Sequence, residues 1–369
     1  MQLDYNIFSV LHLISFVQGI LLGTLLIFLN RRKYRSTFFL GLLVILFSLA
    51  RLHPTLLYLN IFEYYPELFR LPFNFYWLVY PMFFIYTYRV SMFADQKIPY
   101  WVLYPGIIAL IINCVIYFQP YETKLVIDQS LVFKSYLILG IIYSWLIAFW
   151  NISVINRHKT EVDDHFSRTT LKDLTWARYF LIFSLTAYTL YFIQYYVYPE
   201  NLFSKIYILV IDFVTVYWIF FYGLIQRNVL SILSENGYYS IQKRAEKRPV
   251  LKPKNGNLVA LFQKIDTYMK TSESFVQSEL TIVDVAKDLQ IHTKQISTAI
   301  NKVHHKNFNS YVNEFRIEKA ITLLHEKYIS LSIEGIGYEV GFHSKSAFYA
   351  AFKKVTGTTP TKFREKNAA

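Results

Sequence analysis

The sequence predicts an all-α protein, in which a polytopic transmembrane helix bundle of seven spans precedes a smaller polar domain of short helices. Three observations predict this fold class. The 369 residues are 54% hydrophobic and 19% aromatic but only 17% charged, whereas soluble domains carry about a quarter of charged residues. Apolar runs of about 20 residues, the length that crosses a bilayer, recur up to residue 225. Beyond that point apolar residues recur at helical spacing, with no obvious strand pattern.

Seven apolar runs make up the predicted bundle. The run at 99–119 is the weakest, because Pro105, Gly106 and Asn113 interrupt it. The first run is too long for the apolar part of a signal peptide, and no basic segment precedes it. The predicted spans lie near 6–29, 37–60, 71–94, 99–119, 131–155, 177–198 and 203–225.

Basic residues predict the sides of the membrane. RRKYR at 31–35 directly follows the first run, so the positive-inside rule places this loop in the cytosol and the short N-terminus outside. The predicted inner loop at 156–176 carries four basic residues of its own, Arg157, Lys159, Arg168 and Lys172. Seven spans then leave the C-terminus in the cytosol. We therefore expect the bacterial inner (cytoplasmic) membrane as the location and membrane lipids as one partner.

Charge and cysteine content limit the chemistry. The net charge is +13, and residues 226–369 hold 22 basic against 13 acidic residues, a net charge of +9. Such an excess indicates an anionic partner for the polar part of the chain. The single cysteine, Cys114, excludes an intrachain disulfide and a zinc–cysteine cluster. We expect no metal, no cofactor and no catalytic residue, because neither a phosphate-binding loop nor a nucleophile motif is present.

The composition divides the chain into three predicted parts. Residues 1–226 form a transmembrane domain with a sensing role, 227–257 a basic juxtamembrane linker, and 258–369 the polar domain. Turn residues, prolines and basic residues mark the linker at 236–257. It could rest on anionic lipid or act as a solvated tether, and the sequence leaves both interpretations open.

The polar domain contains an internal repeat. TIVDVAKDLQIHTKQISTAINKV at 281–303 can be laid over SIEGIGYEVGFHSKSAFYAAFKKV at 332–355. In each copy a Thr or Ser at a capping position opens a short helix, and a tight turn leads into a second helix whose apolar residues recur four apart. Gly341 suits the positive φ that the second turn needs. This pattern is typical of the helix-turn-helix unit, whose second helix can enter the DNA major groove.

The two units together predict a DNA-reading surface. A periodic helix near 307–326 separates them, and its roughly 18 residues would span about 27 Å, which could set the two reading helices about one DNA turn apart. The outward positions of the second helices carry short donors, amides and cations, with no carboxylate among them. They are Thr293, Lys294, Gln295, Thr298, Asn301 and Lys302 in the first copy, and Ser344, Lys345, Ser346, Tyr349, Lys353 and Lys354 in the second.

Residues 258–366 resemble the DNA-binding domain of the AraC/XylS transcriptional regulators. The resemblance lies in LTIVDVAKDLQIHTKQISTAIN and YVNEFRIEKAITLL, and most specifically in the closing pattern: Gly341–Phe342, Ser346, Phe348, Phe352–Lys353–Lys354, Gly357, Pro360 and Phe363–Arg364. It implies a double helix-turn-helix whose two recognition helices contact successive major grooves.

Four positions depart from the family pattern. Gly335 and Gly337 stand where better helix formers are usual, His292 where a Ser often caps the first turn, and Thr298 where an Arg is common. Each of the two glycines costs about 0.5–1 kcal/mol inside a helix. The departures at His292 and Thr298 imply a weaker grip of the first recognition helix on DNA. The apolar part resembles, in architecture only, AraC-type regulators whose sensing region is a bundle of transmembrane helices.

Ionisable residues inside the predicted spans suggest where a signal could act. Asp212 lies near the middle of the seventh run, and Arg51 and His53 lie in the second. Charges in a membrane are costly and often functional, so Arg51 is a plausible partner for Asp212. A ligand site or proton sensor and a purely structural ion pair both remain open.

Together these features predict a membrane-embedded, one-component transcriptional regulator. It would bind double-stranded promoter DNA under the control of an unknown ligand or signal that the bundle senses. Homodimerisation and contact with RNA polymerase stay open. The alternative is a receptor or transporter-like membrane protein whose C-terminal helical domain binds another protein; a membrane enzyme is disfavoured.

Overall fold

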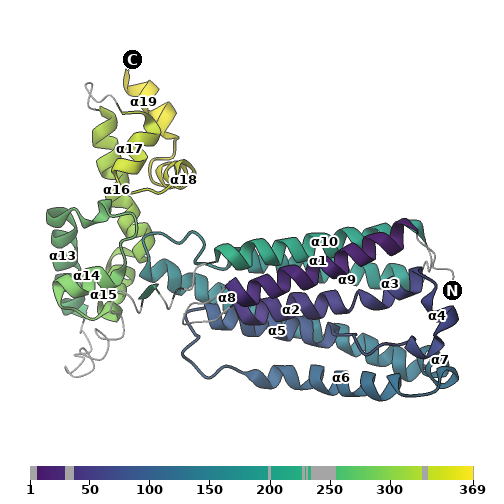
Figure 1. The fold of residues 1–369 in the computed structure, drawn as a ribbon. Coiled ribbons are helices and arrows are strands. Elements are labelled where there is room, and N and C mark those ends of the chain that lie inside the picture. Colours follow the sequence, from purple (N-terminus) through teal and green to yellow (C-terminus); the bar gives the residue numbers. More distant parts are fainter. Residues whose placement is uncertain are drawn as a thin grey trace. The chain divides into compact units, whose positions relative to one another are not determined.

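The computed structural model describes residues 6–29, 37–197, 201–226, 255–325 and 331–368, together with Val229, Ile232 and Leu233. The described residues are helical apart from turns and one isolated β-bridge. The chain divides into two compact units (Figure 1), one formed by Met1–His158 and Leu171–Leu230, the other by Lys159–Thr170 and Ser231–Ala369. Residues 159–170, which the sequence places with the transmembrane domain, thus group with the C-terminal unit. The basic segment at 31–35 and nearly all of the predicted linker lie outside the described residues.

The first unit is built from apolar helices. Its elements are α1 (Ile7–Leu29), α2 (Thr37–Leu49), α3 (Leu52–Tyr58), α4 (Ile61–Tyr64), η1 (Pro66–Leu68), α5 (Tyr76–Val90), η2 (Tyr100–Leu103), α6 (Tyr104–Tyr117), α7 (Tyr121–Gln129), α8 (Leu131–His165), α9 (Thr175–Val197) and α10 (Leu202–Ile225). α8 belongs to both units, because its residues up to His158 fall in the first and Lys159–His165 in the second.

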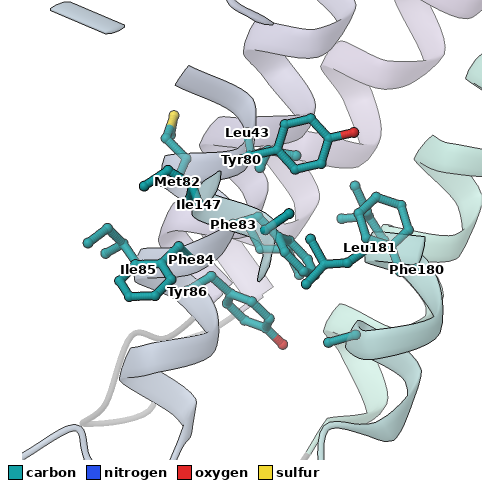
Figure 2. Close-up of a cluster of buried hydrophobic side chains, with 14 of the residues drawn as sticks. Leu43, Tyr80, Met82, Phe83, Phe84, Ile85, Tyr86, Ile147, Phe180 and Leu181 are labelled. Carbon is teal, nitrogen blue, oxygen red and sulfur yellow. The ribbon is translucent and has the colours of Figure 1, made fainter. Parts of the chain in front are cut away.

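Helix α5 forms the centre of the first unit. Its 15 residues include ten buried side chains, and Phe83 and Phe84 are at most 1% exposed. Figure 2 shows the side chains of α5 packed together with Leu43, Ile147, Phe180 and Leu181 from other helices. The aromatic side chains of α5 therefore serve in helix packing.

Small residues bring α1 and α2 close together. A Cβ atom added at Gly23 would lie 2.8 Å from the carbonyl oxygen of Gly41, and one added at Gly41 would lie 2.6 Å from that of Gly23. Backbones that approach this closely are typical of helix pairs in membranes, where dispersion contacts rather than the hydrophobic effect hold helices together.

The outer surface of the first unit is apolar. Leu21 on α1, Ile108 on α6 and Val132 on α8 are 64%, 57% and 81% exposed, and a contiguous apolar surface of this kind indicates a membrane or a partner. Among the described residues, five helical segments are long and apolar enough to cross a bilayer: Ile7–Leu29, Thr37–Tyr58, Tyr100–Tyr117, Leu131–His165 and Leu202–Ile225. The other two predicted spans contain α5, which is short, and α9, which is rich in tyrosine.

The second unit consists of short amphipathic helices around a longer one. They are α13 (Asn255–Ser272), η3 (Ser274–Val276), α14 (Ile282–Leu289), α15 (Thr293–Ala299), a π-helical turn (Ile300–His304), α16 (Phe308–His325), α17 (Ile333–Glu339), α18 (Lys345–Thr356) and α19 (Pro360–Ala368). The pairs α14–α15 and α17–α18 occupy the ranges of the predicted repeat. α16 packs against both η3 and the α17–α18 pair, and so joins the two halves of this unit (Figure 1).

Candidate DNA-binding surface

The first helix pair is fixed by two caps. Thr281 and Asp284 form a capping box at the start of α14, in which each side chain accepts a hydrogen bond from the other's backbone N–H. His292 caps α15, since its Nδ1 accepts from the backbone N–H of Lys294 at 3.1 Å. The departure from the family pattern at His292 therefore leaves the cap in place. Between the helices Gln290 takes the left-handed conformation, with φ of 54°.

The reading face of α15 is narrower than the sequence predicts. Thr293 is only 2% exposed, so its assignment to the outward face is wrong. The reason is that α15 packs against α13 and α14, and its first turn faces inward there. Lys294 is exposed, and Gln295 and Thr298 are half-buried. The Thr298 hydroxyl donates to the carbonyl of Lys294 at 2.7 Å, a local bond that short side chains in helices often make.

Asn301 and Lys302 lie beyond the end of α15, in the π-helical turn. Lys302 is exposed. The amide of Asn301 lies 3.4 Å from both carboxylate oxygens of Asp164 and 3.2 Å from the hydroxyl of Ser297. The first reading face was expected to be free of carboxylates; the structure instead places one there, from the end of α8.

The second helix pair turns at Gly341. This residue has φ of 97°, as predicted, and a Cβ added here would lie 2.5 Å from the carbonyl oxygen of Val276. Both the backbone conformation and the close approach therefore require glycine. Ser344 serves as the cap of α18, because its Oγ accepts from the backbone N–H of Ala347 at 3.3 Å. Ser346 next to it is exposed.

The cations of α18 differ in their surroundings. Lys345 forms an ion pair with Glu334 of α17, and its hydrogen bond and charge lower the pKa of that carboxyl. This second carboxylate also lies beside a face that was expected to have none. Lys353 and Lys354 are both exposed, and the Nζ of Lys354 lies 3.5 Å from the hydroxyl of Ser310.

Tyr349 is less available for bases than the sequence suggests. It is half-buried, and its hydroxyl hydrogen-bonds Thr361 of α19 at 3.0 Å. The Nζ of Lys345 also lies over its ring, 5.5 Å from the centroid. Tyr349 thus helps to fix α18 against α19.

Arg316 of α16 is a structural centre that the sequence reading missed. It is 2% exposed, its Nε donates to the carbonyl of Phe275 at 2.7 Å and its Nη2 to that of Gln277 at 2.8 Å. Its guanidinium also lies 5.5 Å from the ring centroid of Phe342 in the α17–α18 turn. Burial lowers the pKa of Arg316 to about 10, while the charge of Glu279 opposes that shift, so the side chain stays cationic near neutral pH. One signal was present in the sequence: Arg316 follows Val312 and precedes Ala320 at four-residue steps, which places it on the buried face of α16.

The first unit holds one buried charged cluster. Arg51 Nη1 lies 2.7 Å from Asp212 Oδ2, which confirms the pairing predicted from the sequence. The hydroxyl of Tyr188 donates to the other carboxylate oxygen of Asp212 at 3.2 Å and lies 3.1 Å from the hydroxyl of Thr215. His53 instead packs in an aromatic group, 5.1 Å from the ring of Phe62.

The family match to known proteins lies in the second unit. Residues 285–366 match a family described as "Helix-turn-helix domain". The chain is 31% identical over 107 residues to the uncharacterized HTH-type transcriptional regulator YijO of Escherichia coli, covering 29% of this chain and 36% of that protein. It is 27% identical over 90 residues to the uncharacterized HTH-type transcriptional regulator YdeC of Bacillus subtilis, covering 24% and 30%.

Solved structures are similar to about 28% of this chain. The C-terminal domain of AraT, a response regulator from Geobacillus stearothermophilus, is 30% identical, with 28% of this chain and 84% of that chain covered and a TM-score of 0.26. The chain spans about a third of the length of the curated relatives it matches. The family match and these relatives confirm the resemblance predicted for the C-terminal part of the sequence.

Proposed function

Because this chain ends in a helix-turn-helix domain of the AraC type, we propose that it is a membrane-embedded transcriptional regulator that binds promoter DNA. The observation that carries the proposal is the pair of capped reading helices, α15 and α18, each with exposed cations. Lys294 and Lys302 lie on the first unit of the repeat, and Lys353 and Lys354 on the second. Such cations contact phosphates, while neighbouring short side chains can read base edges.

Membrane embedding is supported by the five long apolar helical segments and the exposed apolar surface of the first unit. A further constraint comes from the β-bridge that joins Phe166 to Thr281. Since paired backbones must share a compartment, the loop before α9 and the C-terminal domain lie on one side of the membrane. The chain between them must therefore cross an even number of times. If α10 crosses, α9 crosses as well, which agrees with seven spans and a cytosolic C-terminus.

We assign signal sensing to the transmembrane bundle and propose the Arg51–Asp212 pair as its polar centre. Asp212 is fully buried, and an ionisable residue at membrane depth is costly unless it is paired or functional. Membrane lipids surround the bundle in this proposal. The identity of the ligand, dimerisation and contact with RNA polymerase are not part of it.

DNA binding is tested with the full chain in lipid nanodiscs. Crosslinking the protein to DNA in cells identifies its binding sites, and fluorescence anisotropy then measures its affinity for such a site at several salt concentrations. We expect affinity to fall steeply with salt, because phosphate contacts release counterions. Lys354→Ala should weaken binding to every sequence and lower the slope of log K against log salt by about one. Lys345→Ala should change the preferred sequence if that side chain reads a base.

Lys270→Ala is the matched control. Lys270 is exposed on α13, outside the residues of both reading helices, and is already paired with Asp266, so its removal should leave the salt dependence unchanged. Salt-independent retention of a protein partner, with no DNA affinity in the wild type, would instead establish the C-terminal domain as a protein-interaction module.

A further inference from the structure

Residues 159–170 form part of the DNA-binding unit although they are far from it in sequence. This segment, here named the α8 strap, comprises the last turns of α8 and the chain that follows. It is attached first through the backbone: Phe166 forms an antiparallel bridge with Thr281, the N-cap of α14. Ser167 adds two bonds to the carbonyl of Leu280, from its backbone N–H at 3.0 Å and from its hydroxyl at 2.7 Å. Phe166 is 1% exposed, so its ring is part of the core.

A second set of contacts attaches the strap to α16. The amide of Asn309 donates to the backbone carbonyl of Ser167 at 2.7 Å. Arg316 donates to the hydroxyl of the same serine at 3.2 Å. Arg168 forms an ion pair with Glu279. The strap therefore contacts the start of α14 and also α16, the helix that joins both reading units. Its contact with α16 includes Arg316, whose guanidinium also lies over the ring of Phe342.

The strap brings one carboxylate, that of Asp164, to the first reading unit. Its sequence, KTEVDDHFSRTT, contains Glu161, Asp163 and Asp164. The Asp164 carboxylate accepts hydrogen bonds from Asn301, at 3.4 Å to each oxygen. The Asp164 carboxylate binds the side-chain amide of Asn301, which is then not available to DNA. Its negative charge also repels the phosphates that Lys302, the residue after Asn301, would attract.

We propose that the α8 strap is an autoinhibitory contact, which holds the first reading unit in a state of low DNA affinity while it is docked. This inference rests on the proposed DNA-binding function. The strap continues α8 without a break in the helix up to His165, so a displacement of α8 in the bundle is transmitted along it to Asp164 and Ser167. A signal that favours the undocked strap raises DNA affinity only by its differential affinity for the two states. The linker at 227–257 is then not the sole route from bundle to DNA.

A charge substitution tests the inhibitory part of the contact. Asp164→Asn removes the negative charge and keeps the side chain's size. In full-length protein in nanodiscs we expect about threefold to tenfold tighter DNA binding, the effect of removing one repulsive charge a few ångströms from a phosphate. Glu161→Gln is the matched control, because it removes a charge from the same helix turn while Glu161 faces His165 rather than the reading unit; its affinity should change by less than twofold. Weaker binding by Asp164→Asn, or equal tightening by both variants, would overturn the proposal.

A reversible crosslink tests the need for undocking. Arg168 and Glu279 form an ion pair two residues from the isolated Phe166–Thr281 bridge on each side. A disulfide between these positions needs Cα atoms about 4.4–6.8 Å apart, and its formation is checked by mass spectrometry. Since Cys114 is the single cysteine, Cys114→Ser gives a cysteine-free parent into which Arg168→Cys and Glu279→Cys are introduced together.

The two redox states of that variant separate the possible failures. We expect the oxidised protein to bind its DNA site at least tenfold more weakly than the reduced protein, with the reduced protein binding at least as tightly as the Cys114→Ser parent, because it lacks the Arg168–Glu279 ion pair. Equal affinity of both states would overturn the autoinhibition. Tighter binding when oxidised would also overturn it, and would make the strap a buttress of the reading unit. Loss of DNA binding by the parent itself would refute the proposed function, not the role of the strap.

Discussion

At the scale of single residues, Gly337 shows why a position that is unfavourable for a helix can still be required. The sequence marks it as a poor helix former inside α17, where Ala is more usual in the family that this domain resembles. In the structure a Cβ at this position would lie 2.8, 2.9 and 3.2 Å from three atoms of Phe348. Phe348 is fully buried against Ile336 and Val340 in the core of the second reading unit. The glycine thus allows an aromatic ring to pack directly on the backbone of α17.

We therefore expect Gly337→Ala to destabilise the second reading unit and Gly335→Ala to be neutral or stabilising. Overpacking a core costs about 1–3 kcal/mol, which outweighs the ~0.5–1 kcal/mol that Ala gains over Gly in a helix. At Gly335 the nearest atom to an added Cβ is the Ser332 hydroxyl oxygen at 3.3 Å. The higher helix propensity of Ala therefore decides the effect of this substitution on stability. Hydrogen exchange of peptides from α17 and α18 in the intact protein measures the local stability of both variants. Faster exchange in Gly335→Ala than in Gly337→Ala would contradict this account.

At the scale of elements, the join between the start of α3 and α10 depends on charge in an apolar bundle. Arg51, at the N-cap of α3, is paired with Asp212 in the middle of α10. Asp212 uses both carboxylate oxygens, for Arg51 and for Tyr188 of α9. Three helices therefore meet at one carboxylate. Removing one partner of a buried pair leaves the other charge without compensation.

We expect Arg51→Met and Asp212→Asn each to lower the stability of the bundle by about 3–5 kcal/mol, and the double variant to lose less than the sum. The measurement is the fraction of protein that stays monodisperse in detergent after heating, for the wild type, both single variants and the double variant. Tyr217→Phe, on the exposed side of α10, serves as the control. If the pair is purely structural, the double variant loses less stability than the sum of the single variants, and promoter output from the folded variants is unchanged. Constitutive promoter output from a folded single variant supports the sensing role instead.

The elements themselves could be predicted from the sequence wherever a local pattern specifies them. Apolar length indicated the positions of α1, α6, α8 and α10, and helical periodicity with capping residues indicated both helix pairs, because these signals act over a few neighbouring residues. The burial of Thr293 could not be seen in the same way. The pattern of residue types around Thr293 assigned it to the outward face of α15, whereas this residue is buried in a helix that packs against both α13 and α14.

At the scale of the whole molecule, the sequence did not indicate the α8 strap, because its pairing has no local pattern. Phe166 and Thr281 are joined across more than a hundred residues, and Arg168 was interpreted only as one of the basic residues of an inner loop. The DNA-binding face showed the same limit. Its own residues are free of carboxylates, as expected, but Asp164 and Glu334 reach it from other elements. Composition specifies the two units, whereas long-range contacts specify which side chains of other elements lie beside the recognition helices.

Segments that are hydrogen-bonded to each other must lie on the same side of a membrane. The strap and the C-terminal domain are hydrogen-bonded to each other, so both must lie in the cytosol if the domain binds DNA. If α8 crosses the membrane once, as we propose, helix α7 lies on the outer side. In the cysteine-free Cys114→Ser parent, single substitutions place a reporter in each region: Glu122→Cys in α7, Thr170→Cys in the strap and Lys362→Cys in α19, all at exposed positions.

We expect a membrane-impermeant maleimide to label Glu122→Cys in intact cells, and to label Thr170→Cys and Lys362→Cys only after the membrane is permeabilised. The positive-inside rule and the parity of crossings give the same assignment by independent routes. Labelling of Thr170→Cys in intact cells while Lys362→Cys stays protected would contradict it, since an odd number of crossings would then separate two segments that the structure pairs. Protection of all three would remove α8 from the set of spans, and the strap would lose its connection to a membrane signal.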